Sequence, residues 1–548
     1  MTKPNDWPTF IAVQAVTLIF AALAVYLVMI QGVPDVPVMD EWDLLAERQL
    51  SQGQPAWYLS HHNEHRYPTG KFVWWQLLQA GNFNFRVPML ATVVVLAAAA
   101  LLLQWMMRGW RGVSSPWDAL YPALLLHWGH GFNFTMSYQI GFAMHTYGLC
   151  GWLWAGRWHQ QTRSTGWLLM AMLYALLACS CGGFGLATTP VFLLWCGWMG
   201  RQSVHQRRWL QSAGLGAVAL GWLAYAVWYY RTMPKTMVDY GINPLREPLA
   251  CIAVVWKFLA SSVDAFIYYP HFTRPWLGLA LLLGVAAVAI HRWTRDRINI
   301  VFLSPALLSM PLIGVALAYG RGDVVAERYA IVAVPFTAAL WAILTRSGTT
   351  RRRYWLVVLV AAGCLFWWNH EEGLQKAMQT RVSLEEFKTG LQSGTPPLIL
   401  AGRYGSGCGL LVGDRVEWEI PLLRKLGVPL FQTGTVEAPY RKVGFPVPDR
   451  LKDITSDSPL SLPVPPPTAW AAYFLIRHDK IAATDFVKFR FTDVEEKQTT
   501  KYCQILLNHT DRMIAVDFAP GSIKEWSIEF HGMNGGFHIL DAAWICPP

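Results

Sequence analysis

The chain has 548 residues, of which 53% are hydrophobic and 15% are charged, and 29 of them are tryptophan. This composition excludes a soluble enzyme with a single core and is typical of a multi-pass membrane protein. The formal net charge is +10, but the basic residues fall in short clusters between apolar segments, as they do in cytoplasmic loops. A nucleic-acid partner is therefore not expected.

The first apolar segment, Thr9 to Ile30, carries no charge and has the length of a membrane-spanning helix. It is longer than the apolar part of a secretory signal, and no small-residue cleavage site follows it closely, so we expect an uncleaved anchor. Further apolar segments predict α-helices at 87–107, 116–134, 139–157, 166–181, 185–200, 209–230, 249–269, 275–291, 299–319, 329–345 and 354–368.

Charged loops predict the orientation of these segments. Several loops are rich in arginine, such as the one with Arg201, Arg207 and Arg208, whereas the loop from Gln31 to Lys71 is mainly acidic. Because cytoplasmic loops are enriched in Lys and Arg, we place the arginine-rich loops inside and the acidic loop outside. The result is about eleven crossings, with a cytoplasmic N-terminus and an exported C-terminus.

The segment 249–269 interrupts this alternation. An odd number of crossings is required between the outer loop at Arg231 and the inner loop at Arg292, but two apolar segments lie there. Lys257, Ser261 and Asp264 would lie on one face of a helix there. Such a helix can lie in the interface or re-enter the membrane without crossing it. The alternative is an ordinary span whose polar side chains pack against neighbours, which would require two other segments to merge.

The composition changes at Asn369, where charges become frequent and long apolar segments end. We therefore predict a transmembrane domain at 1–368, in which 31–86 forms the first periplasmic loop, and a soluble periplasmic domain at 369–548. The fold class is an α-helical multi-pass membrane protein with a C-terminal β-rich or mixed α/β exported domain. Within that domain we expect a short helix at 421–426 and strands at 471–476, 486–491 and 512–518.

Four groups of polar residues are expected on the exported side. A transporter would place charges near the middle of the bilayer, whereas here the spans are almost free of charge, so we expect any chemistry at the outer interface. The groups are Asp40, Glu41 and Asp43; His61, His62, Asn63, Glu64, His65, Arg66 and Lys71; Asn133 and Gln139; and Arg321, Asp323, Glu327, Arg328 and Tyr329.

The acidic and histidine-rich groups each allow more than one interpretation. Carboxylates so close to the end of a span usually face water or a polar cavity, and the alternative for Asp40 and Glu41 is a solvated loop. His61 and His65 would share a helical face beside Glu64, which leaves a divalent cation open, although the spacing is not that of a zinc-protease motif. The other possibilities are a surface that orients donor or acceptor and structural hydrogen bonding.

Arg321 and Arg328 predict a phosphate site, because a guanidinium forks around phosphate oxygens as an ammonium cannot. At the rim of a membrane, the head group of a polyprenyl phosphate is the natural anion. The alternative is that Arg321 pairs with Asp323 and Arg328 with Glu327, which would tie the two helices together without binding a ligand.

An acidic pair just after the first span, many further spans and an exported C-terminal domain resemble the GT-C glycosyltransferases, integral-membrane enzymes that use a polyprenyl-phosphate-linked sugar. The chain is similar in particular to bacterial multi-pass proteins of that layout. The matching segments are Asp40-Glu41-Trp42, His62-Asn63-Glu64-His65-Arg66, Asn133 with Tyr138-Gln139, Cys181-Gly182-Gly183-Phe184-Gly185, and Glu327-Arg328-Tyr329.

The resemblance implies an inverting sugar transfer at the periplasmic face of the bacterial inner membrane, to a glycan, a lipid or a pilin-like protein. Asp40, or Glu41 in its place, would be the general base. Arg328, with Arg321 or Lys71, would neutralise the lipid phosphate, and the other polar residues would bind substrate. No cofactor is implied beyond the divalent cation left open above. A lipid or glycan transporter and a non-catalytic envelope-assembly protein are the alternatives.

Overall fold

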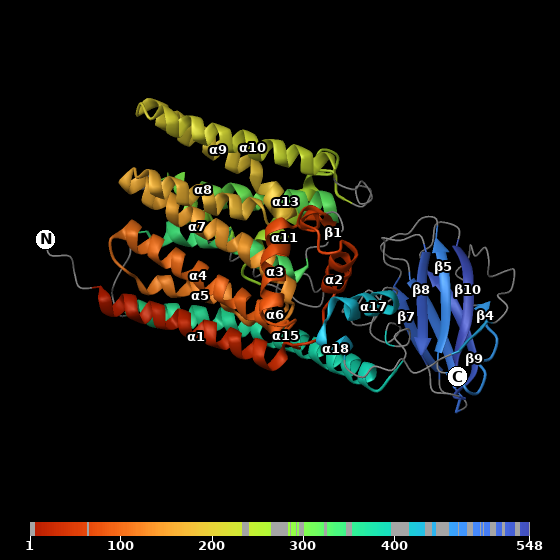
Figure 1. Cartoon of the computed structure of the whole chain (residues 1–548). Helices are drawn as coiled ribbons and strands as arrows, with labels where there is room; N and C mark the ends of the chain where they lie inside the picture. Colours follow the sequence, from red (N-terminus) through yellow and green to blue (C-terminus); the bar gives the residue numbers. More distant parts are fainter. Residues whose placement is uncertain are drawn as a thin grey trace. The chain divides into compact units, whose positions relative to one another are not determined.

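The computed structural model divides the chain into two compact units, Met1–Pro34 with Pro55–Met378, and Asp35–Gln54 with Gln379–Pro548. Figure 1 shows the helices and strands of both units. The structure describes residues 6–62, 65–232, 241–264, 283–284, 286–291, 293–294, 301–322, 326–346, 353–395, 400, 416–432, 441–444, 460–469, 471–478, 486–493, 495–496, 498–504, 511–517, 521–531 and 537–546.

The first unit is built from helices (Figure 1). The pairs α1 and α4, α4 and α7, α7 and α8, and α9 and α10 pack against each other. The helices are α1 (Trp7–Gln31), α3 (Pro68–Ala80), α4 (Arg86–Arg111), α5 (Leu120–Leu126), α6 (Gly131–Thr135), α7 (Ile140–Thr162), α8 (Thr165–Cys179), α9 (Gly183–His205), α10 (Trp209–Arg231), α11 (Pro248–Ser261), α13 (Ser304–Arg321), α14 (Ala330–Leu344) and α15 (Arg353–Gln392).

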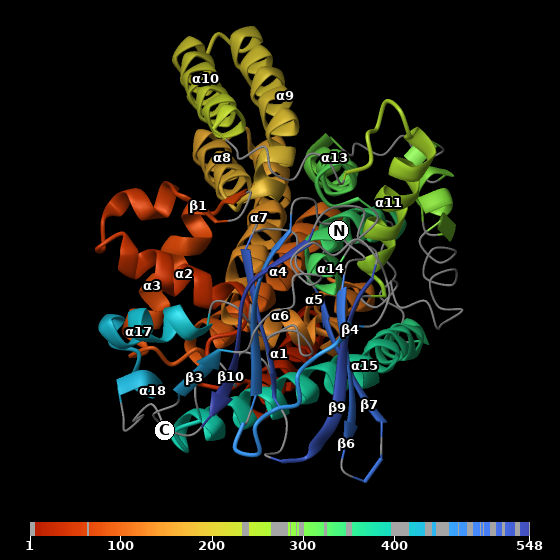
Figure 2. The same cartoon turned by 90° about the vertical axis from the view of Figure 1, so that its right-hand side faces the viewer.

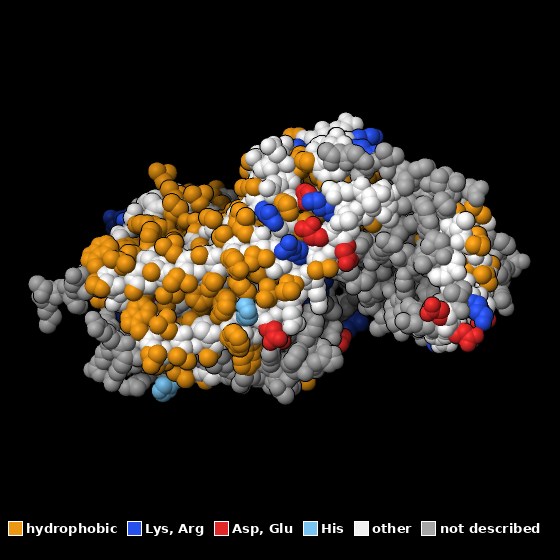
Figure 3. Space-filling model, turned by 90° about the horizontal axis from the view of Figure 1, so that it is seen from below, with side chains coloured by type: hydrophobic (Ala, Val, Ile, Leu, Met, Phe, Trp, Pro, Cys, Tyr) orange, Lys and Arg blue, Asp and Glu red, His pale blue; other side chains and the backbone are white. Residues whose placement is uncertain are grey.

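Five of the described helices are long and apolar enough to cross a membrane: Trp7–Gln31, Arg86–Arg111, Trp209–Arg231, Val301–Arg321 and Glu327–Leu344. Large apolar side chains also lie on the surface of this unit, among them Leu18 at 71% exposure and Leu220 at 69%. Hydrophobic side chains cover most of the face of the helices seen in Figure 3. Such a surface is expected against lipid, and this is the architecture of a helical membrane protein.

The predicted helix at 116–134 is interrupted. The chain there forms the 3-10 turn η2 (Pro116–Ala119), α5, the turn η3 (Trp128–His130) and α6. The Nδ1 atom of His127 accepts a hydrogen bond of 3.1 Å from the backbone N–H of Gly129, a local bond that competes with the helical pattern. A Cβ atom on Gly129 would come within 2.7 Å of Asn369, so this turn lies directly against α15.

The segment 249–269 contains α11, a helix of 14 residues, which is shorter than the roughly 20 residues that a span needs. Lys257 is exposed, whereas Ser261 and Asp264 are buried, and Asp264 accepts a hydrogen bond of 3.1 Å from the indole of Trp368. The three polar residues therefore do not form one exposed stripe. Residues 265–269 and most of the predicted helix at 275–291 lie outside the described residues.

The start of α1 and the end of α4 lie together at one end of the first unit. Asp6 pairs with Arg108 at 3.1 Å and accepts a bond of 2.9 Å from the backbone N–H of Ser114. Burial acts to raise the pKa of Asp6, but these bonds outweigh it and hold the pKa below its usual value. The N-terminus and the arginine-rich end of α4 are therefore at the same end, the one that the sequence predicts to be cytoplasmic.

The second unit contains α2 (Asp40–Leu50), α17 (Val416–Leu426), α18 (Pro429–Gln432) and two four-stranded antiparallel sheets, seen edge-on in Figure 2. The sheets contact each other through Trp526, whose ring centroid lies 5.8 Å from that of Phe474 and 5.2 Å from that of Trp544. In sheet order, the strands are β3 (Arg441–Gly444), β10 (Phe537–Cys546), β5 (Ala471–His478) and β8 (Asp511–Asp517), and then β4 (Leu460–Ser461), β9 (Ile523–His531), β6 (Phe486–Asp493) and β7 (Gln498–Gln504).

The helix and the strands expected near 421, 471, 486 and 512 coincide with α17, β5, β6 and β8. The unit boundaries differ from the predicted ones. α15 is continuous from Arg353 to Gln392, and the division falls after Met378 rather than after residue 368. The first loop is also divided, because 35–54 belongs to the second unit.

Candidate functional site

Asp40, Glu41 and Asp43 occupy the first turn of α2, in the second unit. Carboxylates are favourable there because they interact with the partial positive charge of the helix N-terminus. Glu41 is fully buried, and its Oε2 accepts a hydrogen bond of 2.8 Å from the backbone N–H of Val38. Asp43 is also buried, whereas Asp40 is the most exposed of the three. The sequence allowed a solvated loop at Asp40 and Glu41, but the structure has the start of a helix there.

Trp42 fixes α2 within its unit. Its indole N–H donates a hydrogen bond of 2.8 Å to the carbonyl of Pro37, and its ring meets the rings of Phe387 and Phe431 edge-on, with centroids 5.6 and 5.5 Å apart. These residues come from segments far apart in the sequence. The position of Asp40 in its unit is therefore set by an aromatic anchor two residues away.

The histidine-rich segment of the first unit is a short hairpin. β1 (His61–His62) pairs antiparallel with β2 (His65–Arg66), so that His61 lies opposite Arg66 and His62 opposite His65. The prediction that His61 and His65 share a helical face is therefore wrong. Asn63 and Glu64 lie outside the described residues.

Arg66 attaches this hairpin to the end of α10. Its guanidinium donates to the carbonyl of Leu59 and to the hydroxyl of Thr232, the latter at 2.9 Å, and lies 4.1 Å from the centroid of the Trp228 ring. Its backbone N–H donates to the hydroxyl of Tyr229 at 2.9 Å. Burial lowers the pKa of Arg66 below its usual value. These contacts favour a structural role for Arg66 over substrate binding.

Lys71 is fully buried beneath the turn η1 (Pro55–Leu59). Its ammonium lies 2.9 Å from the Ser60 hydroxyl and 3.3 Å from the Ser60 carbonyl, and 5.0 Å from the centroid of the Trp57 ring. A buried ammonium needs such acceptors. Through these contacts Lys71 holds the loop around Ser60 in place. They do not favour Lys71 as the cation that neutralises the lipid phosphate.

Asn133 in α6 and Gln139 in the turn η4 (Ser137–Gln139) are each 1% exposed. Within the described part of the chain, neither amide atom of Asn133 nor the Oε1 of Gln139 has a hydrogen-bond partner. Buried amides without partners are uncommon and require an explanation, such as an ordered water or a bound polar group. Both residues therefore remain candidates for contact with a ligand.

The turn η7 (Glu327–Tyr329) joins α13 to α14. Glu327 forms an ion pair with Lys376 of α15, a partner that the sequence does not indicate. The guanidinium of Arg328 lies 5.5 Å from the ring centroid of Tyr329. Arg321 ends α13 and is partly exposed, while Asp323, its predicted partner, lies outside the described residues.

Aromatic rings connect these parts of the first unit. Tyr138 lies next to His62 at 6.0 Å and to Tyr67 at 5.5 Å between ring centroids. Tyr67 stacks on Phe142 at 6.3 Å, and Phe142 stacks on Tyr329 at 5.8 Å. The histidine hairpin, the Tyr138-Gln139 segment and the η7 turn are therefore parts of one cluster.

The glycine-rich segment after α8 belongs to the same cluster. Phe184 lies 4.8 Å from Phe142 and 5.6 Å from Tyr329 between ring centroids. Gly182 has a positive φ of 82°, and a Cβ atom there would come within 2.7 Å of the ring of Tyr67. Glycine is required at this position both by the backbone conformation and by the close approach of the tyrosine.

Sequence reasoning missed the histidines at the break between α5 and α6. The rings of His127 and His130 lie 4.1 Å apart, and both residues are fully buried. His130 Nε2 bonds to the carbonyl of Leu124 at 3.0 Å, while His127 Nε2 and His130 Nδ1 have no partner among the described residues. The sequence did contain a signal for these two histidines, because ionisable residues within an apolar segment are functional candidates by default.

The η3 and α6 elements, which carry His130 and Asn133, both contact the η7 turn. Buried polar groups and an arginine-bearing turn thus meet at one end of the first unit. Comparison of the chain with models of protein families and with curated proteins found no match.

Proposed function

We propose that the protein is a membrane glycosyltransferase that moves a sugar from a polyprenyl-phosphate donor to a cell-envelope acceptor, with inversion at the anomeric carbon. The supporting observation is the assembly around Tyr67, Tyr138 and Phe142 of segments that are far apart in the sequence. The His62 hairpin, the Cys181–Gly185 segment and the turn with Arg328 all contribute to it.

Asp40 is the general base in this proposal, with Glu41 as the alternative. Glu41 already accepts a backbone hydrogen bond from Val38 and is fully buried, so its carboxylate serves the start of α2. Asp40 takes the proton of an acceptor hydroxyl while the oxygen attacks the anomeric carbon. The bond from that carbon to the phosphate oxygen breaks, and its electron pair leaves with the lipid phosphate. General-base assistance of this kind contributes about 10²–10⁴ in rate.

The departing lipid phosphate needs a cation, and Arg328 is the candidate in the first unit. A guanidinium can donate two parallel hydrogen bonds to phosphate oxygens. Glu327 forms an ion pair with Lys376, so these two charges balance each other beside the turn. The buried amides of Asn133 and Gln139 are suited to sugar or phosphate oxygens, because amides both donate and accept.

The topology of the proposal is about eleven crossings in a bacterial inner membrane, with an exported C-terminal domain. The donor would then bind at the periplasmic face, and the acceptor would be a glycan, a lipid or a pilin-like protein. The direct test is analysis of lipid-linked glycans in a deletion strain that carries either the wild-type chain or Asp40→Asn. An unchanged glycan profile in the deletion strain would contradict the enzymatic interpretation, whereas restoration of the profile by both chains would contradict Asp40 as the base.

A further inference from the structure

A groove between α8 and α10 has no part in the proposed transfer. Its volume is about 670 Å³, within the range of pockets that hold organic ligands. Its walls are mainly apolar, formed by Leu168, Leu169 and Met172 of α8 and by Leu210, Leu215 and Val218 of α10. Leu210 is 91% exposed and Leu169 50% exposed, so the groove is open on the outer surface of the helices.

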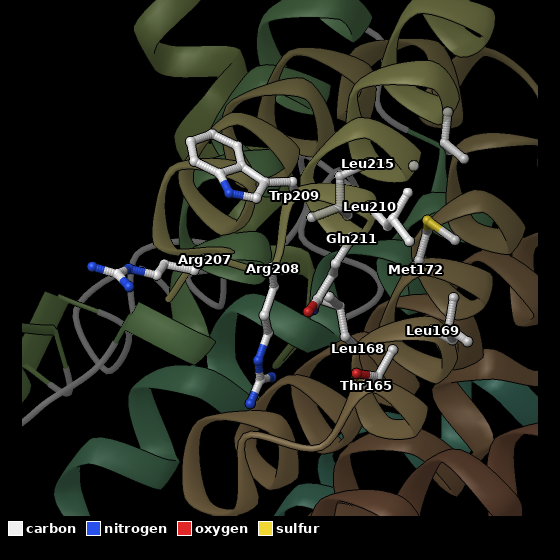
Figure 4. Close-up of a pocket in the computed structure, with 12 residues that line it drawn as sticks. Thr165, Leu168, Leu169, Met172, Arg207, Arg208, Trp209, Leu210, Gln211 and Leu215 are labelled. Carbon is white, nitrogen blue, oxygen red and sulfur yellow. The ribbon is translucent and has the colours of Figure 1, made fainter. Parts of the chain in front are cut away.

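Positive charge lies at one end of this groove. Arg207 and Arg208 belong to its lining and precede α10 directly, and Gln211 lies one turn further along the chain. Figure 4 shows Arg207 and Arg208 on one side, Leu168, Leu169 and Met172 on the other, and Gln211 between the two groups. Arg208 also donates a bond of 2.9 Å to the carbonyl of Arg163, which brings a third arginine to the same loops.

Among the described residues, no carboxylate pairs with this charge. The sequence contains no Asp or Glu between Asp118 and Asp239. Within the part of the chain that the structure describes, neither Arg207 nor Arg208 forms an ion pair. An apolar groove in a membrane-facing surface with arginines at its end fits a molecule that has hydrocarbon chains and an anionic head group.

We propose that this groove binds an anionic glycerophospholipid, with its phosphate at Arg207 and Arg208 and an acyl chain along the leucines of α8 and α10. The arginine-rich end is the one predicted to be cytoplasmic, so the lipid comes from the cytoplasmic leaflet. It is therefore distinct from the polyprenyl-phosphate donor, which the proposed function places at the opposite face.

The first test compares phosphatidylglycerol with phosphatidylcholine of the same acyl chains. The full-length protein in detergent micelles is titrated with each lipid, and lipid adducts are counted by native mass spectrometry. Wild type should bind phosphatidylglycerol more tightly, and each of Arg207→Gln and Arg208→Gln should reduce this preference by about fivefold. Arg201→Gln removes an exposed arginine of α9 that does not line the groove, and should leave the preference unchanged.

A second pair of variants tests the apolar part of the groove. Gly214 lines the groove and Gly216 does not, and a Cβ atom at either position meets nothing within 4 Å. Leucine is also the better helix former, so both variants should fold. Gly214→Leu fills the groove and should abolish binding of long-chain phosphatidylglycerol, whereas Gly216→Leu should bind it as wild type does.

Equal binding of the two lipids by wild type, or unchanged binding after Gly214→Leu, would overturn the proposal. Loss of binding in both leucine variants would also contradict it, because the effect would then not depend on the groove. These readouts need no sugar transfer, so the lipid site and the glycosyltransferase proposal fail or succeed separately.

Discussion

The ring of Tyr329 stacks on the ring of Phe142, with centroids 5.8 Å apart and planes inclined by 28°. Phe184 meets the same tyrosine edge-on at 5.6 Å. Because Tyr329 follows Arg328 directly, these two contacts fix the turn that carries the arginine. The aromatic cluster is thus the means by which α7, α9 and the η7 turn hold the candidate site in one arrangement.

Tyr329→Leu should lower the free energy of unfolding by about 1–3 kcal/mol, because each lost aromatic pair contributes about 0.5–1.5 kcal/mol beyond the buried area. Tyr329→Phe keeps both ring contacts and should be close to wild type. Thermal unfolding of the purified protein in micelles measures the difference. Equal loss in both variants would show that the hydroxyl, and not the ring, maintains the turn.

Arg66→Lys should destabilise the protein without changing donor binding. Lysine cannot keep the bonds to Leu59 and Thr232 together with the contact with Trp228, and the expected loss is about 1–3 kcal/mol. Thr232→Val removes one acceptor and should cost less. The apparent KM for the donor should stay at its wild-type value in the folded fraction of Arg66→Lys. A raised KM with unchanged unfolding would instead identify Arg66 as a substrate-binding residue.

Arg328→Lys should weaken transfer strongly, since lysine keeps the charge but loses the two-pronged fork. Loss of one charge-assisted contact with a partly buried phosphate costs about 1.5–3 kcal/mol, or roughly ten- to a hundredfold in transfer. Arg328→Ala should be worse. Glu327→Gln is the control, because it breaks the ion pair with Lys376 and leaves the guanidinium in place. If Arg328→Lys transfers sugar at the wild-type rate, Arg328 does not bind the phosphate and only connects the two helices.

Reporter fusions test the orientation independently of any activity. Fusions after Arg111, Arg208 and Arg353 should report the cytoplasm, because these arginines belong to the basic loops and such loops are typically cytoplasmic. A fusion after Gln392, the last residue of α15, should report the exported side. A cytoplasmic signal at Gln392 would remove the periplasmic placement of the second unit and the predicted location of the reaction.

Apolar periodicity and length were sufficient to predict much of the helical unit. Helices were expected at 9–30 and 87–107, and the structure has α1 at Trp7–Gln31 and α4 at Arg86–Arg111. The segment 116–134 was predicted as one helix and is broken at His127, where a side chain bonds to a backbone N–H nearby. Such a local competition depends on the position of the imidazole, which hydropathy does not encode.

The candidate site was harder to predict because its contacts are long-range. The sequence singled out His62, Tyr138 and Tyr329, but nothing in it shows that Phe142 lies between Tyr67 and Tyr329. The pairing of Glu327 with Lys376 was missed for the same reason. His61 and His65 were placed on a helix because their spacing allows it, and a two-residue strand is too short to give a periodic signal.

The most direct measurement uses purified protein in proteoliposomes with polyprenyl-phosphate-linked sugars, an envelope extract as acceptor, and release of polyprenyl phosphate as the readout. Wild type should consume at least one donor, and Asp40→Asn at equal protein amount should not, because asparagine is nearly isosteric but cannot take the proton. Glu41→Gln should retain transfer, since its amide oxygen can still accept the bond from Val38. Consumption of no donor by wild type, or equal consumption by wild type and Asp40→Asn, would contradict the account.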